Sequence, residues 1–548
     1  MNFTMIPRAK RANKAKGYFA FESLQFFSVG GGEAFGRTLK ALLPEVKIEA
    51  AERENANVIL SVASVFSSQP EYCAIRIWPD RLELRCRDEA GARNAACILA
   101  QIIEDNRIPC GDIADWPDAP YRAMMLESSG RCWLSMERIY LYIRQMALAR
   151  MNELQFHFME FPGCTIQLDC YPDMHGFGPD NLKYSKEEIR AMIAYAAELG
   201  ITVTPFVEVL SHSFAFNKAA DIACPGDTDE RMFAVCVGQE KTYEAIEKVL
   251  AEVADLFPSP LLHIGGDEYD MSAVSPRTVH WGECPHCRAL SKRMGYTTYR
   301  ELFIYAVERV NQIVNKLGKV AMLWNADLKP GELPDSLERN LVIHYYRNDN
   351  ILCKEKIFGL SMDGYVEEGF SVLNSSFRQT YLDKYVTSER LSSWGYTDDP
   401  RVSAPNRAGV IGGCCCAWDA SRHFERSISP SIFLFADRLW HSYGDPTNYD
   451  DAFGRQLTRL MFDGLLPADM NVFDAVGDVL PPLVLEKDVL FHERKMVASL
   501  AELERIHTAL TGLNHPLAAP YAEIAAAALA FRKAQTDTPL KKTLQFEG

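Results

Sequence analysis

The stretch that decides the fold is Leu-Leu-His-Ile-Gly-Gly-Asp-Glu, residues 261–268, in which an apolar run ends in two glycines and two adjacent carboxylates. Adjacent side chains of a strand point to opposite faces, so Asp267 and Glu268 can converge only where the strand ends. Gly265 and Gly266 allow the irregular backbone that this needs. Carboxylates that share a site have separated pKa values, so one is ionised while the other is protonated and can act as a general acid. Cleavage of a glycosidic bond needs this division of roles. From the local pattern alone, an acidic first turn of a helix explains the pair equally well.

This segment is one of eight apolar, strand-like runs that alternate with amphipathic helices. The runs cover residues 124–126, 154–158, 203–207, 261–264, 320–324, 341–345, 372–374 and 409–412. One intervening helix has a capping box, Ser185 with Glu188, and Gly200 at its end. Eight strand–helix units predict a (β/α)8 barrel, an α/β fold.

The rest of the chain divides around this barrel. Short strand-like runs at residues 58–62 and 82–86, with a helical stretch near 94–103, indicate a small α+β domain. Residues beyond about 450 are helical in pattern and include an alanine-rich stretch at 525–534. We therefore predict an N-terminal α+β domain over 1–118, the barrel over 119–445 and a C-terminal helical extension over 446–548.

Composition narrows the class of protein. The chain has 548 residues, 48% of them hydrophobic and 24% charged, which excludes a fibrous or disordered protein. The net charge of −15 argues against a nucleic acid or an anionic membrane as partner. No apolar run approaches the roughly 18 residues of a membrane span, and no secretion signal is recognisable. With 15 cysteines, neighbours in the run 414–416 pointing to opposite strand faces, we expect reduced thiols and a cytoplasmic location.

Polar and aromatic side chains follow the predicted strands, where barrel enzymes place their chemistry. They are Glu127, Arg131, His157, Glu160, Glu208, His212, Asp267, Glu268, Trp324, Asn325, Asp327, Tyr346, Arg347, Tyr381, Asp383, Trp394, Trp418 and Asp419. Each alone is more often structural than catalytic. Together they predict a pocket of carboxylates, imidazoles and aromatic walls, which suits a sugar.

The chain resembles glycoside hydrolase family 20, the retaining β-N-acetylhexosaminidases, over roughly residues 55 to 445. The core of the resemblance is the His-x-Gly-Gly-Asp-Glu string at 263–268. Further pieces occur in the family's order at residues 113–117, 121–122, 145–154, 211–213, 322–325, 381–383 and 436–440.

The resemblance implies substrate-assisted catalysis. Glu268 would be the general acid and then the base, and Asp267 would hold the 2-acetamido N–H while the acetamido oxygen attacks the anomeric carbon. Tyr381 would donate to that oxygen, and His212 with Glu160 would tune the acid. The implied sugar-binding residues are Arg122, which would grip distal hydroxyls, Asp383, and the aromatic walls Trp324, Tyr346, Trp394 and Trp418.

Several positions depart from the family pattern. After the last strand the family commonly has Trp-x-Glu, whereas this chain has Trp418-Asp419-Ala420, so Ala420 stands in place of the glutamate. Ala123 stands in place of a glycine, and Glu127 and Glu160 stand in place of aspartates. Tyr346 stands where a tryptophan is common. These changes leave open the sugar epimer and the groups tolerated at O4 and O6.

Three alternatives stay open. Cys284-Pro285-His286-Cys287, with His280 before it, has a spacing compatible with zinc, but no second cysteine pair of ligand spacing accompanies it, so we expect no metal and no cofactor. A carbohydrate-binding protein without activity would keep the aromatic walls and relax the acids. A conventional glycosidase would use Asp267 as its nucleophile.

The favoured expectation is an exo-acting enzyme that removes terminal β-linked GlcNAc or GalNAc. Its partner would be a small-molecule or oligosaccharide substrate, and a homodimer stays open as an assembly.

Overall fold

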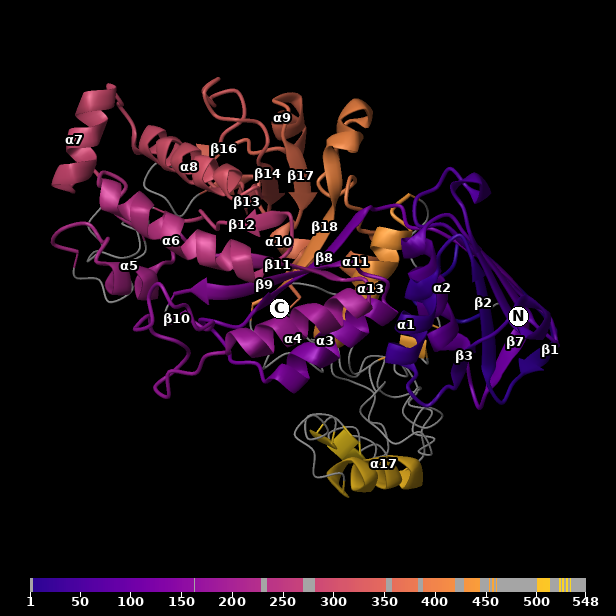
Figure 1. The fold of residues 1–548 in the computed structure, drawn as a ribbon. Helices are drawn as coiled ribbons and strands as arrows, with labels where there is room; N and C mark the ends of the chain where they lie inside the picture. The colour runs from indigo at the N-terminus through magenta and orange to yellow at the C-terminus, as the bar shows by residue number, and fades with distance from the viewer. Residues whose placement is uncertain are drawn as a thin grey trace, which may run out of the picture.

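Eight parallel strands close into a barrel in the computed structural model (Figure 1). The structure describes residues 3–161, 163–227, 234–269, 281–350, 357–382, 388–418, 428–443 and 500–512, with single positions between 453 and 533. The barrel strands are β8 (Tyr121–Glu127), β9 (Glu153–Glu160), β11 (Thr202–Val207), β12 (Leu261–His263), β13 (Val320–Trp324), β14 (Val342–Tyr345), β17 (Ser371–Asn374) and β18 (Val410–Ala417). Each pairs with the next, and β18 pairs with β8 to close the ring. The predicted (β/α)8 barrel is confirmed.

Helices follow the strands and cover the outside of the barrel. The longer ones are α3 (Met136–Leu148), α4 (Lys186–Glu198), α6 (Glu240–Leu256), α8 (Tyr299–Lys316) and α13 (Ser429–Trp440). Shorter helices are α5 (Phe214–Ala220), α7 (Pro285–Met294), α9 (Met362–Glu367), α10 (Phe377–Thr380) and α11 (Ser388–Ser393). The capping box of Ser185 and Glu188 begins α4 as predicted, and Thr298 with Glu301 forms another at α8.

Strand alternation separates the barrel interior from the layer beneath the helices. Cys414 and Cys416 of β18 belong to the interior cluster, with Phe206, Met322 and Trp324. Cys415 between them packs in the outer core under the helices. Gln155 of β9 also reaches this cluster, since its amide bonds to the sulfurs of Met322 (3.3 Å) and Cys414 (3.7 Å). The mainly hydrophobic and aromatic interior forms a floor for groups at the carboxyl ends of the strands.

A seven-stranded sheet precedes the barrel and lies beside it (Figure 1). Its strands are β1 (Arg11–Ala20), β2 (Leu24–Val29), β3 (Ile48–Ala50), β4 (Val58–Val62), β5 (Cys73–Ile77), β6 (Leu82–Cys86) and β7 (Arg107–Asp115). Helices α1 (Glu33–Leu42) and α2 (Glu89–Ile102) join it to the barrel, where the Thr38 hydroxyl of α1 donates to the Glu198 carbonyl of α4 (3.1 Å). The predicted α+β unit is present, and α2 begins five residues earlier than the helical pattern indicated.

Small elements complete the described chain. They are β10 (Gly163–Cys164), β15 (Asp349–Asn350), β16 (Ile357–Phe358), the 3-10 turns η1 (Arg53–Asn55), η2 (Ser64–Phe66) and η3 (Ala404–Gly409), and helix α17 (Leu500–Gly512). Most of the predicted C-terminal extension lies outside the described residues, so the domain boundaries after residues 118 and 445 stay proposals.

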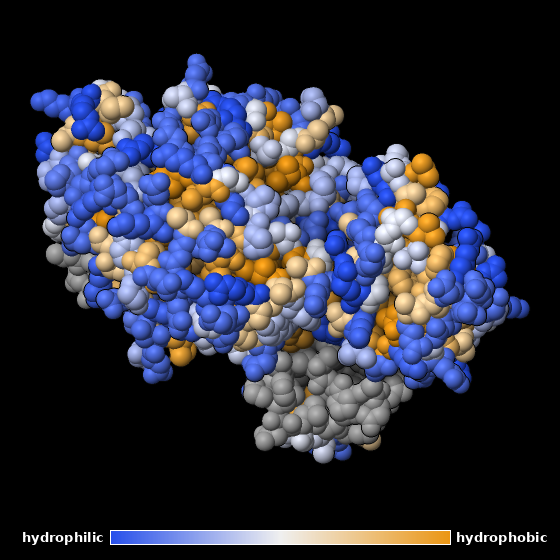
Figure 2. All heavy atoms as spheres, in the orientation of Figure 1, coloured by the Kyte–Doolittle hydropathy of each residue, from blue (hydrophilic) through white to orange (hydrophobic). Residues whose placement is uncertain are grey.

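Hydrophilic residues predominate on the face of the molecule in Figure 2, with hydrophobic residues in the furrows between elements. Within the described ranges, no helix has both the length and the apolar character needed to cross a bilayer.

Candidate active site

The two adjacent carboxylates lie where β12 gives way to a turn. Gly265 and Gly266 both have positive φ angles, 70° and 92°, and so does Glu268 at 51°. A Cβ at Gly265 would collide with the carboxylate of Glu208, whose Oε2 accepts a hydrogen bond from the Gly266 N–H (3.1 Å). This turn frees Asp267 and Glu268 from strand alternation, so both reach the same space at the carboxyl end of the barrel.

His212 links the carboxylate pair to a further acid. Its Nδ1 lies 3.0 Å from Oε1 of Glu160, at the end of β9, and its Nε2 lies 3.5 Å from Oε2 of Glu268. One side-chain atom each from His212, Asp267 and Glu268 lies within 4.8 Å of the others. Glu160, His212 and Glu268 therefore form a continuous row of ionisable groups.

Charge and burial divide the protons among these groups. Burial lowers the pKa of His212, but the negative charges of Glu160 and Asp267 outweigh it and hold that pKa well above its usual range. Burial raises the pKa of Glu160, yet the His212 charge prevails and brings it to about 2. His212 and Glu160 are therefore an ion pair at neutral pH.

The two catalytic candidates titrate differently. Burial is the largest influence on Asp267 and raises its pKa to about 7. Burial also raises the pKa of Glu268, but the hydrogen bond and charge of His212 outweigh it and lower the pKa below its usual range. Near pH 6, these pKa shifts therefore favour one proton on the pair, carried by Asp267 rather than by Glu268.

Aromatic side chains enclose the space beside the carboxylates. The ring of Trp324, at the end of β13, lies 5.3 Å from that of Tyr346 and 6.1 Å from that of Trp418. Tyr381 lies 5.9 Å from Trp418. Burial, followed for Tyr346 by the charges of Asp267 and Glu268, raises the pKa of both tyrosines well above the usual range, so their hydroxyls stay protonated.

Several buried polar atoms of these residues have no hydrogen-bond partner within the described part of the chain. They are Oδ1 of Asp267, the Tyr346 hydroxyl and Nε1 of Trp324, all buried. Buried polar groups in native proteins are otherwise almost always paired. Such atoms are therefore suited to a polar ligand held between aromatic rings.

Comparison with known proteins agrees with this geometry. Residues 120–442 match the catalytic domain of glycosyl hydrolase family 20, which is more than half of the chain. The chain belongs to this family.

Named members of the family are distant in sequence. A β-hexosaminidase of Vibrio furnissii is 27% identical over 410 residues, which cover 66% of this chain and 63% of that protein. A β-hexosaminidase of Porphyromonas gingivalis is 29% identical over 361 residues, 61% of this chain and 44% of that protein. The chain thus matches less than two thirds of the length of these relatives.

Solved family 20 structures share the fold. The β-N-acetylhexosaminidase of Bacteroides fragilis superimposes with a TM-score of 0.71 at 24% identity, covering 84% of this chain and 95% of that one. The family 20 exo-β-N-acetylglucosaminidase of Vibrio harveyi, in complex with N-acetylglucosamine, gives 0.71 at 20% identity, with 86% and 80% covered.

The structure of this family 20 chain brings most of the predicted site residues together. Those that meet at the carboxyl end of the barrel are Glu160, His212, Asp267, Glu268, Trp324, Tyr346, Tyr381 and Trp418. Their individual roles stay predictions. Asp383, Asp419, Ala420 and His280 lie outside the described residues.

The prediction for Arg122 is wrong. Arg122 is the second residue of β8, so it lies at the amino end of the strand, opposite the site. It is 1% exposed, and its guanidinium donates to the Glu71 carboxylate (3.0 and 2.7 Å) and to the Arg150 carbonyl (2.9 Å). These bonds join the barrel to the N-terminal sheet domain and leave nothing for a sugar.

Arg131 is the arginine that lies at the site. Its guanidinium carbon is 4.5 Å from the centre of the Trp418 ring, and its Nη1 is 3.9 Å from Oε2 of Glu160. The turn that carries it is held by Glu127, whose Oε1 accepts from the N–H groups of Ser129 (2.8 Å) and Arg131 (3.2 Å). Its place after the end of a predicted strand was the signal that pointed to it.

The prediction that Trp394 is a wall of the pocket is also wrong. Trp394 is fully buried outside the barrel, and its ring lies 4.8 Å from that of Phe435 on α13. Its carbonyl accepts from Nε of Arg438 (2.7 Å), and a Cβ at Gly413 of β18 would collide with its ring. It therefore fills the space between strand and helix.

Two buried histidines form part of the floor. Nε2 of His263 lies 3.1 Å from Nδ1 of His344, and burial lowers the pKa of both, to about 3 for His344. Both are neutral at physiological pH and stack or pack edge-on against Trp324. Neither was predicted as a site residue, because a histidine within an apolar run is usually a core residue.

Proposed function

We propose that this protein is a retaining exo-β-N-acetylhexosaminidase that hydrolyses terminal β-linked GlcNAc or GalNAc by substrate-assisted catalysis. The observation that carries the proposal is the row Glu160–His212–Glu268, with Asp267 beside it and aromatic rings around it. An acid tuned by a charged histidine, next to a second buried carboxylate, fits this mechanism.

The names of relatives support the same activity. The curated family members described above are β-hexosaminidases, and the solved Vibrio harveyi enzyme is described as an exo-β-N-acetylglucosaminidase holding N-acetylglucosamine.

In the first step, Glu268 protonates the glycosidic oxygen while the substrate's acetamido oxygen attacks the anomeric carbon. The bond to the leaving group breaks and an oxazolinium intermediate forms, so no protein side chain becomes covalently bound. The Asp267 carboxylate accepts a hydrogen bond from the acetamido N–H and stabilises the positive charge of the oxazolinium ring. The Tyr381 hydroxyl donates a hydrogen bond to the acetamido oxygen.

In the second step, a water molecule attacks the anomeric carbon from the side that the leaving group has vacated. The Glu268 carboxylate takes a proton from this water, and the oxazolinium ring opens to regenerate the acetamido group. Two inversions at the anomeric carbon give net retention of configuration.

Substrate binding has to move the shared proton. Burial places it on Asp267, whereas the mechanism needs it on Glu268. An acetamido N–H that donates to Asp267 favours the charged carboxylate and lowers its pKa. The proton is then free to move to Glu268. Only a substrate with a 2-acetamido group therefore converts Glu268 to the protonated form that acts as general acid.

The aromatic residues and Arg131 supply binding energy for the sugar. The rings of Trp324, Tyr346 and Trp418 offer apolar faces to its C–H groups and to the acetyl methyl. Arg131, beside Trp418, offers several N–H donors for the hydroxyls distal to the cleaved bond. Asp383 is predicted to add a further hydroxyl contact.

The test is hydrolysis of p-nitrophenyl β-GlcNAc, β-GalNAc and β-glucoside by wild type and Glu268→Gln. We expect turnover of the acetamido sugars alone, and their ratio gives the epimer preference. Removing the general acid typically costs about 10²- to 10⁴-fold in rate. Glu244→Gln, an exposed position on α6, is the matched control and should be unchanged.

Other outcomes would contradict the proposal. Turnover of the glucoside would favour the conventional glycosidase with Asp267 as nucleophile. Sugar binding without turnover of any substrate would favour a carbohydrate-binding protein.

We also propose a cytoplasmic location, because all the described cysteines are free thiols, as is usual in a reducing compartment. Cell fractionation tests this location. A homodimer stays open, and light scattering on the purified protein decides the assembly.

A further inference from the structure

Four buried cysteines from two separate loops meet beside the start of α7. Cys224 and Cys236 come from the loop between β11 and α6, and Cys284 and Cys287 come from the loop between β12 and α8. Their four sulfur atoms lie within 4.8 Å of one another, and all four are free thiols. We propose that this cluster is a structural zinc site that fastens the two loops to each other.

The sulfur spacing matches a tetrahedral tetrathiolate. Sγ of Cys236 lies 3.5 Å from Sγ of Cys284 and 3.9 Å from Sγ of Cys287. Zinc–sulfur bonds of about 2.3 Å in a tetrahedron place neighbouring sulfurs about 3.8 Å apart. A disulfide would require about 2.05 Å. The sulfurs are therefore spaced for a metal ion between them, and four cysteines are a donor set typical of structural zinc.

The backbone at the second loop holds its pair at a helix start. Cys284 is the residue before the first turn of α7, Pro285 occupies that turn, and Cys287 follows within it. The carbonyl of Cys284 accepts from the N–H of Arg288 (3.0 Å). The helix start thus holds the two buried cysteines three residues apart, while the side chain of His286 is exposed.

The first loop is drawn tightly over this helix start. Cys236 donates its N–H to the Ile222 carbonyl (2.8 Å), next to a bridge between Ala223 and Val235 that brings Cys224 alongside. A Cβ at Gly238 would collide with the backbone of His286 and Cys287, so only glycine permits this approach.

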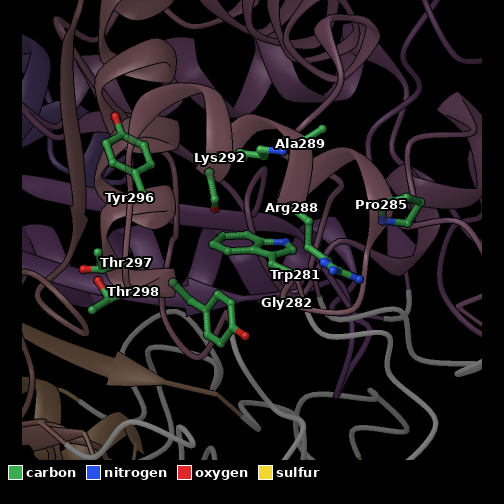
Figure 3. Close-up of a pocket in the computed structure, with 11 residues that line it drawn as sticks. Trp281, Gly282, Pro285, Arg288, Ala289, Lys292, Tyr296, Thr297 and Thr298 are labelled. Atoms are coloured by element: carbon green, nitrogen blue, oxygen red, sulfur yellow. The ribbon is translucent and has the colours of Figure 1, made fainter.

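Trp281 ties the loops together next to the cluster. Its Nε1 donates to the Val235 carbonyl (2.9 Å). Figure 3 shows Trp281 beside Arg288 and the start of α7, within an open cavity of about 580 Å³ that holds none of the candidate catalytic residues. This cavity is therefore separate from the active site.

Packing of thiols as small apolar groups is the competing explanation, because free cysteines are often buried. Cys97 on α2 illustrates it, since it is buried in the hydrophobic core and belongs to no such group of ligating side chains in the described chain. Core packing does not require four sulfurs at the spacing of a tetrahedron. No metal was predicted from the sequence, because Cys224 and Cys236 are too far apart in the chain to form a recognisable pair.

The two loops also carry the active-site groups. His212 lies on the loop of Cys224 and Cys236, and Asp267 and Glu268 lie on the loop of Cys284 and Cys287. A zinc ion would fix the far ends of both loops and so limit the movement of His212 relative to Glu268. The metal itself does not reach the substrate and has a structural role only.

The first test measures metal in the full-length protein, purified without chelators or metal-affinity resin. Elemental analysis should find about one zinc ion per chain. Cys287→Ser and Cys236→Ser should each lose this zinc, whereas Cys97→Ser should retain it. Metal content is measured without any activity assay, so failure of the proposed function would not affect this result.

A second test uses the wild-type protein, in case the cysteine variants do not fold. A mercurial reagent should release zinc to a chromophoric chelator as the thiols react, and cobalt exchanged into the site should give the intense visible absorption of a tetrahedral thiolate complex. Bound iron instead of zinc, disulfides found by mass spectrometry, or four thiols that alkylate freely with no metal present would each overturn the proposal.

Discussion

The proton shared by Asp267 and Glu268 should set the alkaline limit of activity. Catalysis requires one proton on the pair, and the pair loses it as the pH rises through the pKa of Asp267, about 7. We therefore expect kcat/KM to be flat near pH 6 and to fall about tenfold per pH unit above pH 7 to 8. Initial rates with the p-nitrophenyl substrate, measured from pH 5 to 9, check this.

The acidic side of the same profile depends on Glu268. His212 lowers the pKa of Glu268 below its usual range, so activity should persist down to at least pH 5. Glu153→Gln is the control: this buried carboxyl at the opposite end of β9 has a pKa raised by burial to about 8. If the alkaline limb moved in that variant, the limb would not belong to the catalytic pair.

Arg131 and Arg122, which lie near opposite ends of β8, should behave in opposite ways. Arg131→Ala removes a donor beside Trp418, and we expect KM to rise roughly tenfold or more, because a hydrogen bond to a charged group contributes about 1.5–3 kcal/mol. Its melting temperature should stay near that of wild type, since the side chain is 41% exposed. Michaelis–Menten kinetics and thermal unfolding measure the two effects.

Arg122→Ala is the counterpart. It leaves Glu71 without its buried partner, which typically costs about 3–5 kcal/mol of folding free energy. Its melting temperature should fall while KM of the remaining folded protein stays unchanged. If Arg122→Ala kept the melting temperature of wild type but had a higher KM, Arg122 would be a sugar-binding residue after all.

At the scale of elements, the turn after β12 decides where the carboxylates point. Gly265→Ala places a Cβ against the Glu208 carboxylate, so the turn has to shift and carry Asp267 and Glu268 away from His212. We expect a loss of kcat of about 10²-fold, since displacements near 1 Å have that effect. The matched control is Gly266→Ala, where φ is also positive but the nearest atom to the new Cβ is 3.8 Å away.

Comparing the two variants separates collision from backbone strain. Both substitutions place alanine at a positive φ, which costs about 1–2 kcal/mol. If Gly266→Ala lost as much activity as Gly265→Ala, strain of the turn and not contact with Glu208 would be responsible.

The elements also show what sequence could predict. The runs at 58–62 and 82–86 match β4 and β6, and the capping box of α4 is present, because these patterns depend on near neighbours in the chain. Arg122 and Trp394 failed for a different reason. The direction of a strand decides which end of the barrel each of its residues occupies, and Arg122 lies at the amino end, opposite the site. The side that a loop residue faces depends on tertiary packing, as the contact of Trp394 with α13 shows.

The cysteines mark the limit of local patterns most clearly. Cys284 and Cys287 have a recognisable spacing, which made them candidate zinc ligands from the sequence. Cys224 and Cys236 have none, and only the folding of two loops against each other brings all four sulfurs together. Sites assembled from separate loops depend on the fold and are not visible in spacing alone.

At the scale of the whole molecule, buried charges hold the N-terminal sheet against the barrel. Arg150, which precedes β9, forms an ion pair with Asp115 at the end of β7, and both side chains are fully buried. Asp115 also accepts from Nε1 of Trp440 (2.8 Å), and the guanidinium carbon of Arg150 lies 4.2 Å from the centre of that ring. Two domains and the last described barrel helix, α13, therefore meet at one carboxylate.

The buried ion pair at this junction predicts that a single substitution of Asp115 will strongly lower the stability of the protein. Asp115→Asn leaves the Arg150 guanidinium buried without its countercharge, so we expect a loss of about 3–5 kcal/mol in the free energy of unfolding. Asp112→Asn, on the same strand, is the control: its pair with Arg76 is about 60% exposed on both sides, so less than about 1 kcal/mol should be lost. Denaturant titration followed by fluorescence and circular dichroism measures both. Because the junction joins the sheet domain to the barrel, Asp115→Asn should also separate their unfolding into two transitions. Equal stability of Asp115→Asn and Asp112→Asn would contradict this prediction. It would mean that apolar packing alone holds the sheet and the barrel together.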